Sequence, residues 1–182
     1  MIEEEKMAVI IQEVVGNEHN GKYYPEISGV AQSYNFYPFS YIQPEDGFAV
    51  TAIGLGAYVV GGERTHRFSP AYPKLQLASV QDKIKASQRY FYGINMLAWD
   101  YDLYRDGENA AIKAYELSEA ERDGTLEYTA SVYDFMNDRI TYDFSVKGPR
   151  IVDFSKILQY DYCPLAPTLQ ILLDIFSQAM GS

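Results

Sequence analysis

The chain has 182 residues with a formal net charge of −10, and no cluster of lysine and arginine offsets that charge, which argues against a nucleic-acid partner. Its hydrophobic fraction of 47% and charged fraction of 22% are typical of a globular protein and exclude a disordered one. The length suits a single domain over residues 1–182.

Features that bear on localisation favour the cytoplasm. Cys163 is the only cysteine, so no internal disulfide can form and nothing indicates an oxidising compartment. The first six residues, MIEEEK, are acidic where a signal peptide is basic, and no run approaches the ~20 apolar residues of a membrane span. We therefore expect a cytoplasmic protein without a membrane segment.

The first half of the chain is dominated by strand patterns. Residues 7–15 (MAVIIQEVV) form a β-branched apolar run that ends at Gly16, which predicts a buried strand. Asn20-Gly21 favours a tight turn and a hairpin that leads to a second strand over 27–36. The elements expected next are a third strand over 48–53, a glycine turn with a short helix at 54–60, an edge strand over 64–69 and an extended crossing over 71–77.

The second half adds helices. Ser79 predicts the N-cap of a helix over 80–89. The elements expected after it are a strand over 90–96, an acidic loop over 99–109, a short helix over 117–123, a hairpin of 126–135 with 140–146 around Asn137-Asp138, and a strand over 150–154. Leu169, Leu172, Leu173, Phe176 and Met180 recur at helical spacing and predict a last amphipathic helix, with Pro167 in its first turn. The fold class is therefore α+β, with a mostly antiparallel sheet and flanking helices.

Motifs for chemistry are sparse. The Gly54-x-Gly56 pair has its next glycine at Gly61, which breaks the dinucleotide-binding spacing, and a glycine pair alone is also explained by a tightly packed turn. A calcium loop starting at Asp102 fails, because Tyr104 and Lys113 stand where ligands are needed. We therefore predict no metal site in the chain.

The residues that could act as nucleophile or base are isolated in the sequence. His19 and His66 are the only histidines, and neither lies near Cys163, so we predict no catalytic residue. Cys163 is expected to pack as a small buried group. His66 is expected to face solvent or a neighbouring carboxylate.

Three segments in register resemble a known family. MAVIIQEVVG, EISGVAQSYNFYP and DGFAVTAIGLGAYVVGG are similar, in this order, to the second half of the ATP-grasp nucleotide-binding domain of the phosphoenolpyruvate synthase and pyruvate phosphate dikinase family. The likeness covers about residues 7–68, and a weaker one continues through GPRIVDFSKILQYDYCPLAP to the last helix. The resemblance implies the C-terminal lobe of an ATP-grasp domain.

The resemblance also implies roles for particular residues. The expected nucleotide-binding residues are Gln12, Glu13, Val14 and Val15 as a hinge that meets the adenine edge, Ser28 and Gly29 beneath the nucleotide, and Gly54 and Gly56 where the backbone turns close to it. From the residues alone, Gln12 and Glu13 are equally explained as the polar pair of an edge strand. The family commonly has Glu or Lys where this chain has Ala57, and residues 17–26 form an insertion.

The resemblance implies that this chain lacks part of the residues needed for catalysis. The parent protein would be a phosphotransferase that uses ATP and Mg²⁺ on pyruvate or a related acceptor, and the partners of this chain would be a small-molecule nucleotide and the remaining lobes and domains of its own parent chain. The lysine- and arginine-bearing lobe, the metal-ligand Glu and the phosphohistidine motif of the family are not in this sequence, so we expect no turnover and no tightly bound cofactor. The alternative is a non-catalytic acidic interaction or regulatory module derived from such a lobe, which Ala57 and the insertion fit.

Overall fold

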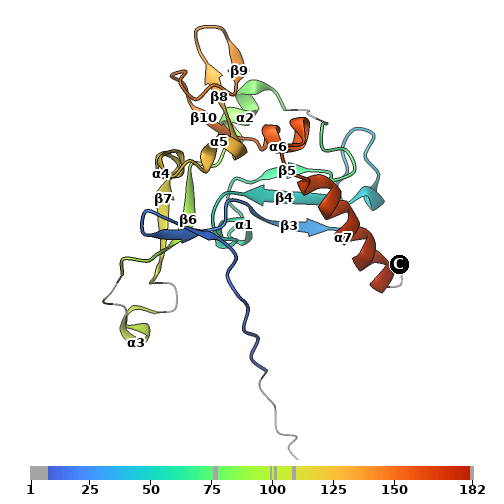
Figure 1. Ribbon diagram of the computed structural model, residues 1–182. Helices are drawn as coiled ribbons and strands as arrows, with labels where there is room; N and C mark the ends of the chain where they lie inside the picture. Colours follow the sequence, from blue (N-terminus) through green and yellow to red (C-terminus); the bar gives the residue numbers. More distant parts are fainter. Residues whose placement is uncertain (1–7, 76–77, 99, 101, 108–109, 181–182) are drawn as a thin grey trace, which may run out of the picture.

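Three small sheets and a set of short helices surround one apolar core (Figure 1). The computed structural model describes residues 8–75, 78–98, 100, 102–107 and 110–180. All strand pairs in this part are antiparallel, which confirms the α+β class with mostly antiparallel sheets. The sheets have the strand orders β1-β2-β6-β7, β3-β4-β5 and β10-β8-β9.

The strands are β1 (Asn17–His19), β2 (Lys22–Tyr24), β3 (Ser28–Gln32), β4 (Phe48–Ala52), β5 (His66–Phe68), β6 (Tyr90–Asn95), β7 (Ile112–Glu116), β8 (Ala130–Asp134), β9 (Arg139–Thr141) and β10 (Arg150–Val152). The helices are α1 (Ala57–Val60), α2 (Val80–Ala86), α3 (Leu103–Asp106), α4 (Leu117–Arg122), α5 (Leu126–Thr129), α6 (Ser155–Tyr160) and α7 (Leu165–Met180), with a 3-10 turn η1 (Pro44–Asp46). No helix in the described part of the chain combines the length and apolar character that crossing a membrane requires.

Most of the strands expected from the sequence are present, but the first is not. Residues 8–16 form no strand and extend away from the body of the molecule, while Met7 lies outside the described residues (Figure 1). Val9, Ile10 and Ile11 are 79%, 84% and 92% exposed. The β-branched pattern predicts an extended chain, but burial also needs a neighbouring strand, and among the described residues none pairs with this segment.

The tight turn at Asn20-Gly21 is confirmed, although it joins different strands from those expected. Asn20 and Gly21 have φ of 51° and 77°, the left-handed pair that a two-residue hairpin turn needs. They connect β1 to β2, and β3 follows as a separate strand in another sheet. The prediction of one strand over 27–36 was therefore wrong at both ends, because β3 covers only Ser28–Gln32.

The core joins the three sheets. Tyr24, Ile53, Phe91, Leu126 and Phe154 are all fully buried, and they come from β2, the end of β4, β6, α5 and the segment after β10. The Tyr24 and Phe91 rings lie 4.6 Å apart at a tilt of 49°, a favourable arrangement for two aromatic rings. The sheets are therefore held to one another by side-chain packing, not by shared strands.

A buried charge cluster fastens α4 to the first hairpin. The Asp123 carboxylate, whose side chain is 0% exposed, accepts hydrogen bonds from Asn20 Nδ2 at 2.7 Å and from the Tyr24 hydroxyl at 2.8 Å. Lys22 Nζ lies 3.2 Å from Asp123 and 3.4 Å from Glu119, with a side chain only 8% exposed. One carboxylate therefore satisfies three donors from the hairpin.

Arg150 performs a similar role for the loop that precedes β10. Its guanidinium donates to both oxygens of Glu121 and to the carbonyl oxygens of Phe144, Val146 and Gly148. The Arg150 side chain is 18% exposed, and its guanidinium lies 5.0 Å from the centre of the Phe144 ring. One side chain thus satisfies three carbonyl groups of the loop.

Replacing Arg150 with methionine is expected to lower the free energy of unfolding by about 2 kcal/mol, because three backbone carbonyls and Glu121 lose their donor. The measurement is urea denaturation followed by circular dichroism. Arg139→Met, the same substitution at an exposed arginine on β9, is the control and is expected to change stability by less than about 0.5 kcal/mol. Equal effects of the two substitutions would refute the role given to Arg150.

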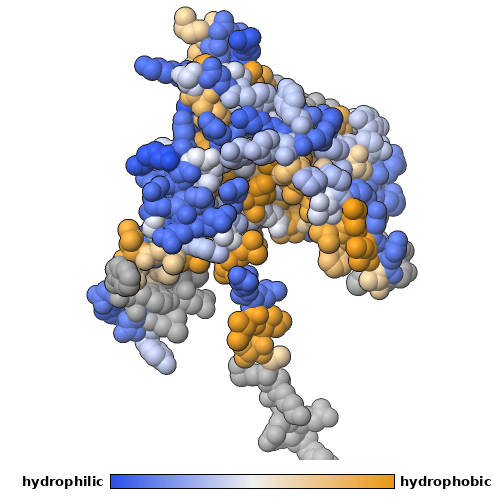
Figure 2. All heavy atoms as spheres, viewed as in Figure 1, coloured by the Kyte–Doolittle hydropathy of each residue, from blue (hydrophilic) through white to orange (hydrophobic). Residues whose placement is uncertain are grey.

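Apolar side chains are exposed on several parts of the surface (Figure 2). They include the extended segment that contains Val9, Ile10 and Ile11, and a face of α7, where Leu172, Ile175 and Phe176 are 41%, 53% and 59% exposed. The prediction of an amphipathic last helix is confirmed, but only its first half is well covered.

Candidate functional site

Four of the eight expected nucleotide-binding residues lie together at one end of the β3–β4 pair. Ser28 and Gly29 of β3 are paired with Ala52 and Thr51 of β4, and Gly54 lies two residues after the end of β4. Gly56 comes next, at the first turn of α1, which packs against both β3 and β4. We call Ser28, Gly29, Gly54 and Gly56 the glycine corner.

The glycines of this corner differ in what surrounds them. Gly54 has a φ of +86°, and a Cβ there would lie 2.6 Å from the carbonyl oxygen of Tyr92, so only glycine fits. A Cβ on Gly29 would collide with the carbonyl oxygen of Val50. Gly56 is exposed, and a Cβ there would meet nothing within 4 Å. Gly29 and Gly54 therefore serve close packing, whereas Gly56 faces open space.

The expected hinge residues start at this corner but do not line it. Gly16 packs against the backbone of Tyr24 and Pro25, and the Gly54 N–H donates to the Pro25 carbonyl oxygen at 3.1 Å, so residue 15 leaves the body next to the corner. The side chains of Gln12, Glu13, Val14 and Val15 are exposed. The Val14 carbonyl oxygen accepts a hydrogen bond from the Tyr23 hydroxyl at 2.9 Å.

Aromatic and charged residues flank the corner at α1. Tyr58 is buried, and its ring centre lies 5.2 Å from that of Tyr90 in an edge-to-face arrangement. Burial raises the pKa of Tyr58, the Glu63 carboxylate adds to this shift, and the Arg64 guanidinium opposes it. Arg64 is thus a cation close to α1 that the sequence gave no reason to single out.

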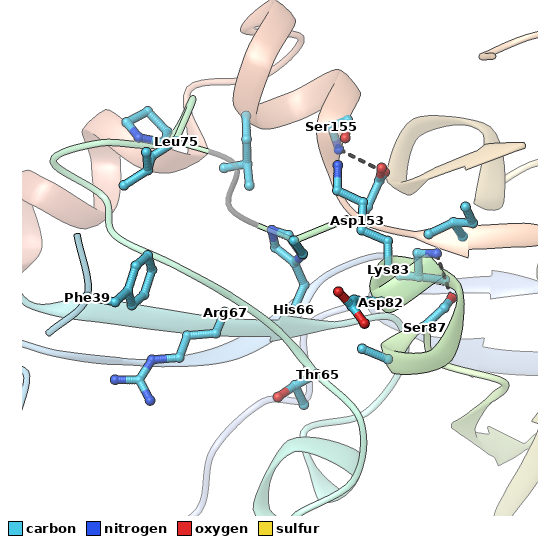
Figure 3. A pocket seen from close by; sticks show the side chains of 16 residues that line it. Phe39, Thr65, His66, Arg67, Leu75, Asp82, Lys83, Ser87, Asp153 and Ser155 are labelled. Atoms are coloured by element: carbon cyan, nitrogen blue, oxygen red, sulfur yellow. Dashed lines mark hydrogen bonds between the residues drawn. The ribbon is translucent and has the colours of Figure 1, made fainter. Parts of the chain in front are cut away.

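The structure also contains a cavity that the sequence did not predict. It has a volume of about 370 Å³ and lies between β5, α2, β10 and α6 (Figure 3). Leu75, Ile151 and Leu158 contribute apolar walls. His66, Asp82 and Lys83 gather at one side of the cavity with Asp153, whereas Arg67 points away from them (Figure 3).

The polar side of this cavity is built around Asp153 and His66. Asp153 is 3% exposed, and its carboxylate accepts from the Ser131 hydroxyl at 3.0 Å and from the Ser155 N–H at 3.1 Å. His66 was expected to face solvent or a carboxylate. It lies on the same side of the cavity as Asp153, whose negative charge acts to raise the pKa of the imidazole. These residues come from different sheets, which β5 and β10 present to the same space.

Burial lowers the pKa of His66 to about 4, against the influence of Asp153, and the Lys83 ammonium lowers it further. The His66 ring centre lies 6.0 Å from that of Phe68 and 5.9 Å from that of Phe154. The imidazole is therefore neutral at physiological pH, with one nitrogen able to donate and the other able to accept. Beside apolar walls, this arrangement suits a small organic molecule with a polar edge.

Cys163 packs against the core cluster, as expected, but it is only partly buried. In the part of the chain that the structure describes, no three or more His, Cys, Asp or Glu side chains are grouped to hold a metal ion.

Comparison with protein-family models, with curated protein sequences and with solved structures found no match to this chain.

Proposed function

We propose that this chain is the nucleotide-binding lobe of a phosphotransferase similar to phosphoenolpyruvate synthase and pyruvate phosphate dikinase, and that the glycine corner is where the nucleotide base lies. The proposal is carried by one observation, the convergence of Ser28 and Gly29 of β3 with Gly54 and Gly56 of the turn after β4, at one end of a sheet. ATP-dependent phosphoryl transfer then belongs to the longer parent chain, and this lobe by itself is inactive.

The chemistry of the corner supports a base rather than a triphosphate. An extended backbone with exposed N–H and C=O groups suits the hydrogen-bonding edge of a purine, and the segment from Gln12 to Val15 leaves the body beside the corner with its side chains exposed. Phosphoryl transfer depends on positioned cations and Mg²⁺. Arg64 is close to α1, but the described residues contain no acidic cluster for a metal ion, so we assign no Mg²⁺ ligand to this chain.

The direct test is titration of isotope-labelled protein with the non-hydrolysable analogue AMP-PNP, followed by amide NMR. We expect millimolar affinity, about −4 kcal/mol, with shifts at Gly29, Gly54 and Gly56 and along residues 12–15. Shifts confined to residues around His66 and Asp153 would place the ligand in the other cavity and overturn the proposal. No shift at any site would do the same.

The substitution Gly56→Glu probes the corner without disturbing the fold. A side chain at Gly56 meets nothing within 4 Å, and its φ of −57° is compatible with any residue. The added carboxylate is expected to weaken AMP-PNP binding about tenfold, because it repels the phosphates and fills the open space. The measurement is the NMR dissociation constant.

Ser118→Glu is the matched control for this prediction, because it adds the same charge at an exposed position on α4. It is expected to leave the dissociation constant within about twofold. If both variants weaken binding equally, the effect is that of net charge, and the corner has no special role.

One observation favours the alternative function, a non-catalytic interaction module. The outer face of α7 exposes Ile171, Leu172, Ile175 and Phe176, which together form an apolar stripe on a helix of 16 residues. A chain that does not bind AMP-PNP, but whose α7 resonances shift on addition of polypeptide from the parent protein, would support this second function.

A further inference from the structure

The apolar segment of residues 8–15 has the composition of a strand, although it is paired with no other strand among the described residues. Its sequence AVIIQEVV is rich in β-branched residues, and Ile10 and Val14 are 84% and 47% exposed. Leaving such side chains in water forgoes the free energy that burial would supply. Burial of Ile10 and Val14 against another surface would therefore stabilise the chain.

An open strand edge lies next to the point where this segment leaves the body. Among the described residues, β3 pairs only with β4, so its other edge presents unpaired N–H and C=O groups. Val30 on β3 is 40% exposed. An open edge of this kind is a template for one more strand.

Helix α7 extends past the same edge. Leu169 and Leu173 lie in or against the core, and Leu173 approaches Gly47, beside the end of β3. The later part of the helix runs beyond β3 to the side where no strand is present, with Ile175 and Phe176 more than half exposed (Figures 1 and 2). A strand added to the open edge of β3 would lie next to this part of the helix.

We propose that residues 8–15 dock on the open edge of β3 of the same chain, as an antiparallel strand that continues the β1–β2 hairpin. The register of that hairpin pairs Asn17 with Tyr24. Extending it by one residue at a time along each strand pairs Gly16 with Pro25, Gln12 with Gly29 and Ile11 with Val30. The hairpin then runs from one sheet into the next.

Gly16 and Pro25 allow the chain to bend between the two sheets. Gly16 packs so closely that a Cβ there would lie 2.7 Å from the carbonyl carbon of Tyr24, and Pro25 on the opposite strand has no N–H to offer. The extended hairpin can therefore bend at Gly16 and Pro25. The bend breaks no hydrogen bond donated by Pro25, because proline has no backbone N–H.

The two faces of the added strand match their surroundings. Ile27 and Ala31 of the β3 segment pack against the core, so the residues opposite them, Val14 and Ile10, share the face on which α7 lies. Ile11 lies on the other face, opposite the exposed Val30. A slip of one residue would exchange the faces, which is why the register matters.

The occupant is this chain rather than a second copy. Gly16 is already held beside Pro25, three residues before β3, so docking on the same chain is an intramolecular event with a high effective concentration. A net charge of −10 on each chain opposes association of two copies. Docking of residues 8–15 does not depend on nucleotide binding. The docked strand would place Gln12 opposite Gly29.

Hydrogen exchange of the unmodified chain is the first test. We expect amides within residues 8–15 to exchange at least about tenfold more slowly than in a free peptide of the same sequence, because alternate N–H groups are bonded to β3. The comparison is the variant Ile10→Pro with Ile11→Pro, which removes a donor to β3 whichever of the two residues faces it. Exchange as fast as in the peptide would overturn the proposal.

Cysteine pairs test the register. In a Cys163→Ala background, Ile11→Cys with Val30→Cys places the two Cβ atoms at cross-strand distance, whereas Val9→Cys with Val30→Cys is two residues out of register. We expect the first pair to form an intramolecular disulfide about tenfold faster. Equal rates would overturn the register, and disulfide-linked dimers as the main product would assign the edge to a second copy instead.

Discussion

Replacing Asp123 with alanine is expected to lower the free energy of unfolding by about 4 kcal/mol, because it leaves a buried ammonium without its closest partner. Lys22 would retain Glu119, at 3.4 Å, and the ring face of Tyr115. Asn20 would lose its acceptor, and the Tyr24 hydroxyl would retain only Thr125 as a partner. For a chain of this length the loss corresponds to a melting temperature lower by about 10 °C. Calorimetry measures both quantities.

The matched control for Asp123 is Asp161→Ala. Asp161 also forms an ion pair, with Lys74 at 3.0 Å, but its side chain is 69% exposed, so the cost is expected to be below about 1 kcal/mol. If the two substitutions have equal effects, the buried cluster does not anchor α4 to the first hairpin.

The same cluster predicts the response to acid. Burial by itself would raise the pKa of Asp123, but hydrogen bonds from Asn20, Tyr24 and Lys22 outweigh it and hold the pKa below its usual value. The stability that this carboxylate contributes is therefore complete above about pH 4 and is lost as the pH falls below that value.

His66 is expected to reduce stability in a different and higher pH window. In the unfolded chain its imidazole takes a proton near pH 6.5, whereas burial, with Lys83 acting in the same direction, holds the pKa of the folded state at about 4. Between these values the unfolded state binds more protons, so the free energy of unfolding falls with decreasing pH, by up to about 1.4 kcal/mol per pH unit and about 3 kcal/mol in all. Chemical denaturation at pH 7, 6, 5 and 4 measures the slope.

The variant His66→Gln should remove this slope, because glutamine does not titrate, and His19→Gln is the same substitution at the other histidine and should leave the slope in place. NMR of the imidazole protons gives the pKa of His66 directly. A titration midpoint near 6.5 for His66 in the folded chain would contradict the burial and the charges described around it.

The glycine corner could be predicted from local patterns, because each of its parts is local. Strand β4 is a short apolar run, Gly54 with a positive φ comes two residues after it, and α1 starts three residues after Gly54. The pairing of Ser28 with Ala52 then needs only that two adjacent strands form a ladder. What the sequence could not show is that residues 12–15 would start beside the corner without lining it.

Other elements were missed because their neighbours determine them. Strand β7 carries no strong pattern and was not predicted, yet it is paired with β6 along its whole length. Residues 126–129 were predicted as strand but form α5, in which Leu126 and Thr129 are both buried. The acidic segment of 99–109 was predicted as loop and contains α3 in its described part. Helix α6 was not predicted either.

The cavity beside His66 could not be predicted at all. His66 and Asp153 are far apart in the sequence, and each reaches the cavity from the edge of a different sheet, β5 in one and β10 in the other. No spacing rule connects them. The only local signal is Asp153 just before a helix, where an acidic residue is common for reasons of capping alone.

The β2–β6 ladder has a consequence for how the chain reaches its native state. The hairpins β1–β2, β6–β7 and β8–β9 join neighbouring segments, but β2–β6 joins Lys22 to Asn95 and Tyr23 to Ile94 and is only these two pairs long. Closing such a large loop costs entropy before the contacts repay it. We expect the hairpins to form early and this ladder to complete the transition state, so substitutions at Tyr23 and Ile94 should slow folding more than they speed unfolding.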